Sequence, residues 1–238
     1  MSNNVVFLPI FCTFMSRCFS QFIDLCLSGA NVKIIGFFSG LTTFGMVQQS
    51  MHIFNIVKSI PNCKILQPSS TKEFELMLAY SAKTNGPVII FVPTFELKCN
   101  VSNLGSVITG KGITLKSGDK MTVLPIGSGA FSWISDIALE LPKIEIINPR
   151  FLKPFDIELL ISSIEKTRKL LVLEDGYKTS GFGGELIYSV KKIYNNFDSE
   201  WIGYEEKFLC GQNYVESQNY LGCSREKIIS IAMSLYNA

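Results

Sequence analysis

Short, continuously apolar runs alternate with amphipathic segments along much of this 238-residue chain. Apolar runs of strand length occupy residues 5–10, 32–38, 63–66 and 87–92, and helical periodicity occupies residues 13–27 and 70–83. A strand that is apolar at nearly every position is typical of a parallel sheet with helices on both faces. The alternation therefore predicts an α/β fold.

A second alternating block follows a stretch in which this pattern lapses. Residues 94–120 are mostly polar, contain four glycines and show no helical periodicity. Beyond them, strand-like runs at 121–126, 144–147 and 169–173 alternate with helical segments at 129–141, 156–168, 183–195 and 225–236. We predict two sandwiched, mostly parallel-sheet domains at residues 1–95 and 120–238. Residues 96–119 would form a linker, with a small hairpin just before Lys120.

Composition excludes several classes of protein. Hydrophobic residues make up 47% of the chain, which is too many for a disordered polypeptide. A net charge of +2 gives no basic footprint for nucleic acid, and the apolar runs are too short to cross a membrane. The apolar segment at residues 5–15 resembles a signal-peptide core, but no basic residue precedes it and Pro9 interrupts it. We read it as a strand leading into a helix and expect a cytoplasmic protein.

Cysteine spacing indicates reduced thiols rather than a disulfide framework or a zinc site. There are seven cysteines, an odd number, with no C-x-x-C pair, and His52 is the only histidine. We therefore expect no metal site and mostly buried, reduced thiols. The cysteines are Cys12, Cys18, Cys26, Cys63, Cys99, Cys210 and Cys223.

Several motifs point to a family. The segment Phe11-Cys-Thr-Phe-Met-Ser-Arg17 and the run Ser59-Ile-Pro-Asn62 occur in the first block. Asn148-Pro-Arg-Phe-Leu-Lys-Pro154, Leu173-Glu-Asp-Gly176 and Gly181-Phe-Gly-Gly184 occur in the second. In this order they resemble the C-terminal half of transketolase-like thiamine diphosphate enzymes. The resemblance covers almost the whole chain and is strongest to 1-deoxy-xylulose-5-phosphate synthases and to the C-terminal subunits of split transketolases.

This resemblance implies a truncated pyrimidine-binding domain followed by a transketolase C-terminal domain. It implies the cofactor thiamine diphosphate with Mg²⁺, whose diphosphate is held in the family by an N-terminal domain that this chain lacks. The family's glutamate that protonates the aminopyrimidine is expected to lie before the first residue of this sequence. We therefore assign no catalytic residue and expect the chain alone to be inactive.

The first motif supplies three candidate binding residues. By resemblance, Phe14 stacks on the aminopyrimidine and Phe11 lies near the cofactor. Arg17 is the only charged residue between Met1 and Gln21 and matches the arginine that meets an anionic substrate group. The alternatives are that Phe14 belongs to the core and that Arg17 is an ordinary helix-surface residue.

This sequence departs from the family pattern at several positions that bear on activity. Gln48 stands where the family has a substrate histidine, and Phe44 where it has an acidic residue, while His52 is not equivalent. Glutamine forms hydrogen bonds but takes no proton near neutral pH, so Gln48 is a substrate-binding candidate only. Phe91 and Thr94 occupy places where the family usually carries phosphate-binding arginines.

Two further features favour a structural interpretation. Glu174 and Asp175 are adjacent on a predicted strand and so point to opposite faces of the sheet. The glycine run at 181–184 opens a predicted helix, as a phosphate cradle does, yet a single glycine run is weak support for phosphate binding.

Three functional hypotheses remain. The chain is a subunit that transfers ketol or acyl units together with a separate diphosphate-binding chain, or it is a degenerate interaction or regulatory protein. The third possibility is that the gene is a fragment. The first two hypotheses predict a partner, either a transketolase-like N-terminal subunit or a homo- or hetero-oligomer, because a truncated domain leaves apolar surface uncovered.

Overall fold

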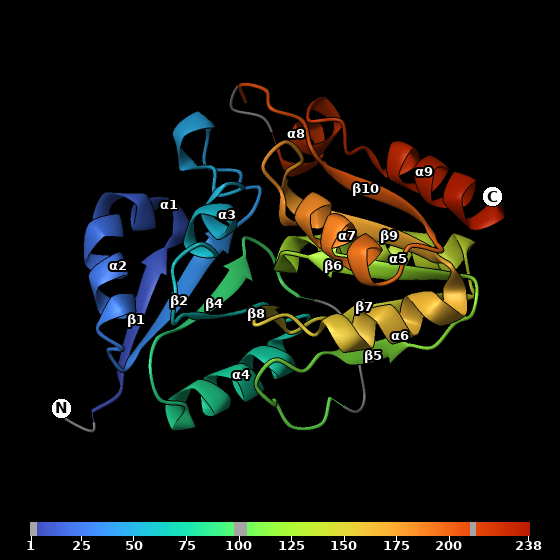
Figure 1. Cartoon of the computed structure of the whole chain (residues 1–238). Coiled ribbons are helices and arrows are strands. Elements are labelled where there is room, and N and C mark those ends of the chain that lie inside the picture. The colour runs from blue at the N-terminus through green and yellow to red at the C-terminus, as the bar shows by residue number, and fades with distance from the viewer. Residues whose placement is uncertain (1–3, 98–103, 210–212) are drawn as a thin grey trace.

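Two five-stranded sheets organise the chain, and the computed structural model describes residues 4–97, 104–209 and 213–238 (Figure 1). The α/β fold with two sandwiched, mostly parallel sheets is confirmed. Of the cysteines, Cys99 and Cys210 lie outside the described residues, and the five described ones are free thiols. Within the described ranges, no helix is long and apolar enough to cross a membrane.

The first sheet has the strand order β1-β2-β4-β3-β8. Its first four strands are parallel, and β8 runs antiparallel to β3. Among the described residues β1 has one partner only, so its outer edge is unpaired. The strands are β1 (Val6–Phe11), β2 (Val32–Ser39), β3 (Lys64–Leu66), β4 (Val88–Pro93) and β8 (Phe151–Lys153).

The second sheet has the order β10-β9-β6-β7-β5. It is parallel except for β5, which runs antiparallel to β7. The strands are β5 (Ile113–Lys116), β6 (Met121–Ile126), β7 (Ile144–Asn148), β9 (Lys169–Tyr177) and β10 (Asp198–Tyr204).

Helices cover both faces of each sheet. On the first sheet, α1 (Cys12–Met15), α2 (Phe19–Leu27) and α3 (Ile53–Val57) pack on one face and α4 (Thr71–Lys83) on the other. On the second, α6 (Ile157–Thr167) and α7 (Phe182–Ile193) lie on one face. The opposite face is covered by α5 (Phe131–Glu140) and α9 (Arg225–Asn237), with α8 (Tyr214–Tyr220) beside them.

Local sequence signals account for two of the helix starts. The Ser70 hydroxyl accepts a hydrogen bond from the Glu73 backbone N–H (3.2 Å) and caps α4. The Asp156 carboxylate accepts one from the Leu159 N–H (3.3 Å) and caps α6. Such caps satisfy backbone donors that have no partner within the helix, and both helices begin where the sequence predicts helical segments, at residues 70–83 and 156–168.

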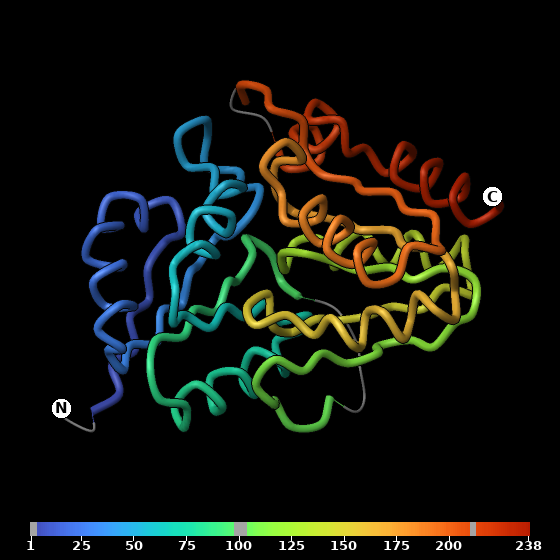
Figure 2. The backbone as a smooth tube through the Cα atoms, viewed as in Figure 1, coloured from blue at the N-terminus to red at the C-terminus, as the bar shows by residue number. Residues whose placement is uncertain are grey.

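The two domains share one apolar core. A single buried cluster includes Phe22 and Ile34 from the first domain and Ile126, Leu160 and Phe182 from the second. The chain also crosses between the sheets, since β8 follows β7 of the second sheet and pairs in the first (Figure 2). The domains are therefore packed together rather than joined only by a linker.

Some expected elements differ from the structure. The helix predicted at 13–27 is interrupted by a 3₁₀ turn at Ser16–Cys18, where the Ser16 hydroxyl donates to the Thr13 carbonyl and competes with regular helix bonding. The hairpin expected before Lys120 is wrong: β5, the described strand there, pairs with β7. Strands β8 and β10 and helix α8 were not predicted, because β8 is very short and β10 is a half-exposed edge strand with charged residues.

Candidate functional site

An aromatic cavity of about 250 Å³ lies where β1 and β2 end. Its walls are Phe11, Phe14, Phe38 and Phe44, joined by Thr13 and Gln48. Ligands of open α/β sheets bind at the carboxyl ends of the strands, which is where this cavity opens. Because it is concave, mostly apolar and has few polar groups, the cavity is a candidate site for a flat, largely apolar group.

The aromatic rings contact one another around the cavity. The rings of Phe11 and Phe38 meet edge to face with centroids 4.6 Å apart, and those of Phe38 and Phe44 do so at 4.9 Å. Phe11 and Phe14 lie 5.6 Å apart in a tilted arrangement. Phe38 takes a positive φ of 59°, which is uncommon for a bulky residue and coincides with a register shift between Phe37 and Ser39 at the end of β2.

Gln48 supplies the polar side of the cavity. The Thr13 hydroxyl donates to Gln48 Oε1 (2.9 Å), linking the loop after β2 to the start of α1. That loop is held by Gln49, whose Oε1 accepts from the Thr42 N–H (2.9 Å) and whose Nε2 donates to the Gly45 carbonyl (3.0 Å). The buried side-chain amide of Gln49 thus holds the loop that positions Gln48.

Arg17 lies beside the cavity without lining it. Its guanidinium carbon is 4.9 Å from the centroid of the Phe14 ring, a cation–π distance, and the residue is exposed. Among the described residues it forms no ion pair within 4.0 Å. The structure therefore brings all four predicted binding residues, Phe11, Phe14, Arg17 and Gln48, to one place.

Phe91 and Thr94, which stand where the family usually carries arginines, contribute packing and hydrogen bonds instead. Phe91 is buried in the shared core, and its carbonyl accepts a hydrogen bond from the Ser128 hydroxyl (3.0 Å). The Thr94 hydroxyl donates to the Leu41 carbonyl (3.3 Å) at the base of the loop after β2. Neither lines the aromatic cavity, and His52 does not line it either.

The loop that carries Gln48 is anchored to the second domain. Asp175 at the end of β9 accepts hydrogen bonds at Oδ1 from the Leu41 N–H (3.2 Å) and the Tyr204 hydroxyl (3.1 Å). Burial raises the pKa of Asp175 to about 7, although these hydrogen bonds oppose the rise. A Cβ on Gly40 or Gly129 would lie within about 2 Å of this carboxylate, so both positions leave room for it.

Glu174, next to Asp175 in β9, bonds the backbone of the glycine run at residues 181–184. Its carboxylate accepts from the N–H groups of Phe182 (2.8 Å) and Gly183 (2.9 Å) and from Trp201 Nε1 (2.9 Å). Burial raises its pKa, and these hydrogen bonds lower it in part. The helix N-terminus that looked like a phosphate cradle is therefore occupied by a side chain of the protein itself.

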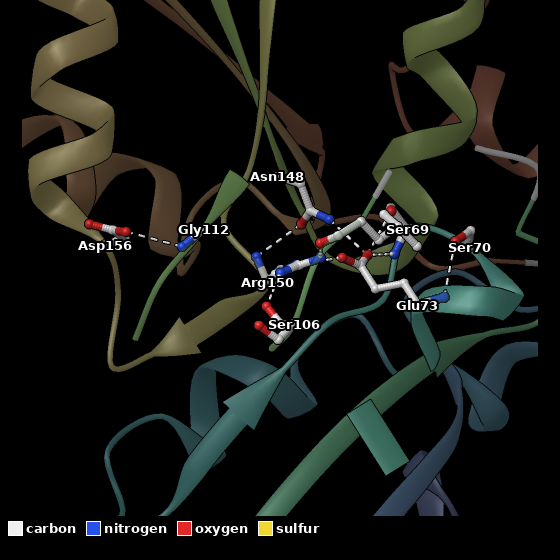
Figure 3. Close-up of polar contacts among 9 residues, drawn as sticks. Ser69, Ser70, Glu73, Ser106, Gly112, Asn148, Arg150 and Asp156 are labelled. Atoms are coloured by element: carbon white, nitrogen blue, oxygen red, sulfur yellow. Dashed lines mark hydrogen bonds and ion pairs between the residues drawn. The ribbon is translucent and has the colours of Figure 1, made fainter. Parts of the chain in front are cut away.

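A buried ion pair between Glu73 of α4 and Arg150, which directly precedes β8, joins the two domains (Figure 3). Arg150 Nε donates to Glu73 Oε1 (2.7 Å), while Asn148 Nδ2 (2.8 Å) and the Ser69 hydroxyl (2.6 Å) donate to Oε2. Arg150 also donates to the Ser106 carbonyl (3.0 Å) in the segment that connects the domains. The N-x-R-F motif is thus an interdomain clasp rather than a ligand site.

The described residues that line the aromatic cavity include no titratable group. The six residues that line it carry no carboxylate, imidazole or amine. Within the described ranges, no cluster of three or more His, Cys, Asp or Glu side chains is arranged to hold a metal ion. The cavity can stack and hydrogen-bond a ring, but it brings no acid, base or metal ligand of its own.

Family models match nearly the whole chain. The transketolase pyrimidine binding domain matches residues 1–98, and the transketolase C-terminal domain matches residues 110–217. The two matched domains follow one another along the chain in the same order as the two sheets of the structure.

Three curated relatives are much longer than this chain. The 1-deoxy-D-xylulose-5-phosphate synthases of Clostridium tetani and Clostridium botulinum (strain Alaska E43 / Type E3) are 24% and 27% identical, over 95% and 96% of the chain. That of Alkaliphilus oremlandii is 29% identical over 74% of it. The chain spans only 37%, 38% and 30% of these three proteins.

Solved structures share the fold. A split-gene transketolase, described as an inactive β4 tetramer, has a TM-score of 0.81 at 18% identity and is matched over 97% of this chain and 76% of its own. A transketolase from Campylobacter jejuni has a TM-score of 0.73 at 14% identity, with 96% of this chain and 35% of its own covered.

Proposed function

The chain belongs to the transketolase family of thiamine diphosphate-dependent transferases, and we propose that it is a subunit that completes its active site with a separate diphosphate-binding chain. The reaction would be the transfer or condensation of a ketol or acyl unit. The observation that carries this proposal is the aromatic cavity, where residues from three separate segments of the first domain converge.

The cavity fits the aminopyrimidine part of the cofactor. Face stacking on Phe14 and edge contacts from Phe11 and Phe38 suit a flat heteroaromatic ring. The Gln48 amide and the Thr13 hydroxyl can hydrogen-bond ring substituents. When bound, thiamine diphosphate supplies the nucleophilic carbon of the reaction. The residues of this chain hold and orient its ring.

The diphosphate and Mg²⁺ do not fit the residues that line this cavity. A diphosphate requires cations or backbone donors, and Mg²⁺ requires carboxylate or carbonyl ligands. The lining residues provide neither a cation nor a carboxylate. In this proposal the diphosphate and Mg²⁺ are held by the separate chain, which is the arrangement that the sequence resemblance implies.

Arg17 is placed to act on the substrate rather than on the cofactor. Its guanidinium is exposed and lies next to Phe14 at the edge of the cavity. A guanidinium binds carboxylate or phosphate groups through paired hydrogen bonds. We assign Arg17 to an anionic group of the substrate and Gln48 to a neutral oxygen.

The surface of the first domain supports a partner. Within the part of the chain that the structure describes, strand β1 is unpaired at its outer edge, and Val6, Phe7, Leu8 and Phe11 each expose 40% or more of their surface. Exposed apolar edge strands normally pair or are covered. This surface lies beside the cavity, so a chain that covers β1 would also approach the site.

A second candidate function is a catalytically degenerate interaction or regulatory protein. The lack of any acid or base among the residues lining the cavity favours it. Under this hypothesis the chain binds a relative of full length or a separate subunit and changes its stability or activity. Cofactor binding and turnover, measured separately, distinguish the two functions.

The test is calorimetric titration of thiamine diphosphate with Mg²⁺. The titration uses the chain alone and then the chain mixed with the product of an adjacent reading frame that carries a diphosphate and Mg²⁺ motif. We expect binding only in the mixture, weakened about ten-fold or more by Phe14→Ala because a stacking partner is lost. The matched control is Phe208→Ala, which removes a phenyl ring that is 89% exposed.

The outcomes separate the hypotheses. Binding that appears in the mixture and depends on Phe14, with turnover that depends on Arg17, supports the subunit proposal. Binding without turnover of any ketol donor supports the degenerate protein. Affinity that is unchanged in Phe14→Ala contradicts the assignment of the cavity to the cofactor.

A further inference from the structure

A groove of about 440 Å³ lies at the outer edge of β10, the strand at one edge of the second sheet (Figure 1). It is bounded by α7 on one side and α9 on the other, and it shares no lining residue with the aromatic cavity. The residues that line it include Lys191 of α7, Asp198, Ser199 and Glu200 of β10, and Ile231 and Leu235 of α9.

The backbone of β10 offers unused hydrogen-bonding groups along this edge. Among the described residues β10 pairs only with β9, and the Asp198 N–H donates to the Arg168 carbonyl (3.0 Å) on that side. Because successive residues of a strand direct their N–H and C=O groups to opposite edges, those of Ser199 and Trp201 point away from β9. Within the described ranges these groups have no backbone partner. The open edge is about 13 Å long, at about 3.3 Å per residue.

The two sides of the groove differ in charge. Ile202 packs in the cluster that includes α9, and Trp201 packs against the start of α7. Since side chains alternate along a strand, Asp198 and Glu200 face the α9 side, as Ile202 does. Both carboxylates are exposed, and among the described residues neither forms an ion pair within 4.0 Å. The α9 side therefore attracts cations, whereas Lys191 repels them from the α7 side.

We propose that the β10 edge is a docking site for an extended, basic peptide segment of a partner protein. The segment would add a strand to the second sheet and pair its main chain with Ser199 and Trp201. Lysine or arginine at alternate positions would face Asp198 and Glu200, and uncharged side chains would face Lys191. In this mode of recognition the main-chain hydrogen bonds supply affinity and the alternate side chains supply specificity.

Charge disfavours a second copy of this chain as the occupant. Antiparallel pairing of two β10 edges about a two-fold axis would place the Asp198 and Glu200 carboxylates of both copies on the same face of neighbouring strands. Like charges on neighbouring strands destabilise their pairing. A basic segment would relieve this repulsion, so the same two carboxylates select a foreign strand over an identical one.

The test measures fluorescence anisotropy with the full chain and a fluorescein-labelled peptide, Thr-Lys-Val-Lys-Val-Lys-Thr amide. We expect saturable binding, and none when glutamate replaces the three lysines. Two further peptides carry N-methyl groups on the lysine amides or on the valine amides. Since only one of these two sets can face β10, one peptide should lose affinity about ten-fold or more and the other should keep it.

Variants of the chain locate the binding site. Ser199→Pro removes an N–H from the open edge and leaves the ladder to β9 intact, so it should weaken binding about five-fold or more. Glu200→Gln should weaken binding about two- to five-fold, the loss expected for one exposed ion pair. Glu75→Gln, at an exposed glutamate of α4, is the control and should leave binding unchanged. If Ser199→Pro does not fold, Glu200→Gln and the two N-methylated peptides still decide the proposal.

Three results would overturn the proposal. They are the absence of saturable binding, equal affinities of the two N-methylated peptides, and equal effects of Glu200→Gln and Glu75→Gln. Self-association of the chain that Ser199→Pro abolishes, measured by light scattering, would assign the edge to a second copy and would also overturn it.

Discussion

The carboxylate of Asp175, in the C-terminal domain, accepts a hydrogen bond from the backbone N–H of Leu41, which begins the loop bearing Gln48. Tyr204 donates to the same oxygen, and Gly40 and Gly129 lie against the carboxylate. One buried acid of the second domain therefore fixes a loop of the first. The shape of the aromatic cavity depends on how the two domains meet.

The first prediction concerns pH. Burial raises the pKa of Asp175 from an ordinary value of 3.8 to about 7, so between these values the folded chain holds a proton that the unfolded chain has lost. Stability from this group is complete below about pH 4 and is lost as pH rises through 7. We expect Asp175→Asn to remove a decline on the order of 2–4 kcal/mol in unfolding free energy between these limits.

Urea unfolding at a series of pH values measures this decline. Asp198→Asn, at an exposed aspartate, is the control and should keep the wild-type dependence on pH. If Asp175→Asn and the wild type show the same slope, the buried carboxylate is not the titrating group.

The second prediction separates steric contact from backbone strain at Gly40. Gly40 and Gly29 have similar positive φ values, 75° and 67°, but only at Gly40 would a Cβ meet another group, Asp175 Oδ2 at 1.8 Å. Gly29→Ala should cost about 1 kcal/mol from the backbone alone. Gly40→Ala should cost several-fold more and alter the loop that carries Gln48.

Thermal and urea unfolding of the two variants measure this difference. Equal costs would mean that Asp175 moves aside without loss. In that case, the contact between the domains at this point would not constrain the loop.

The third prediction concerns the buried ion pair between Glu73 and Arg150. Glu73→Gln keeps the side-chain size but leaves the buried guanidinium without its counter-charge, and such losses typically cost about 3–5 kcal/mol. Glu205→Gln breaks exposed ion pairs with Lys207 and Lys227 and should change stability little. Unfolding free energies of both variants provide the comparison, and similar small changes in both would contradict the clasp.

Elements of the fold that have a local sequence pattern were predictable, and elements defined by contacts between distant residues were not. Apolar runs located most strands, and helical periodicity located the starts of α4 and α6. Strand β8 is defined by pairing with β3 in the other domain, and no local pattern of three residues reveals such a partner. The bond between Arg150 and Glu73 spans 77 residues and likewise has no local signal.

The candidate site was accessible in part through a resemblance of short motifs. Phe11, Phe14 and Gln48 were named from the sequence, and the structure places them around one cavity. Phe38 was missed because it reads as one more apolar residue of a buried strand. It lines the cavity at the register shift near the end of β2, where it takes a positive φ.

The final prediction tests whether the outer edge of β1 is an interface. Among the described residues this edge is unpaired, and Leu8, in the middle of the strand, is 40% exposed. We expect the chain alone to associate with itself as its concentration rises, because an apolar edge strand offers both hydrogen bonds and apolar surface. Leu8→Lys should shift the mass measured by light scattering towards the monomer, since a lysine on an edge strand opposes pairing.

Leu139→Lys, at an apolar residue of α5 that is 79% exposed, is the control and should leave the mass unchanged. A monomeric wild type at all concentrations, or equal masses for the two variants, would contradict an interface at β1 and remove one of the supports for a partner chain.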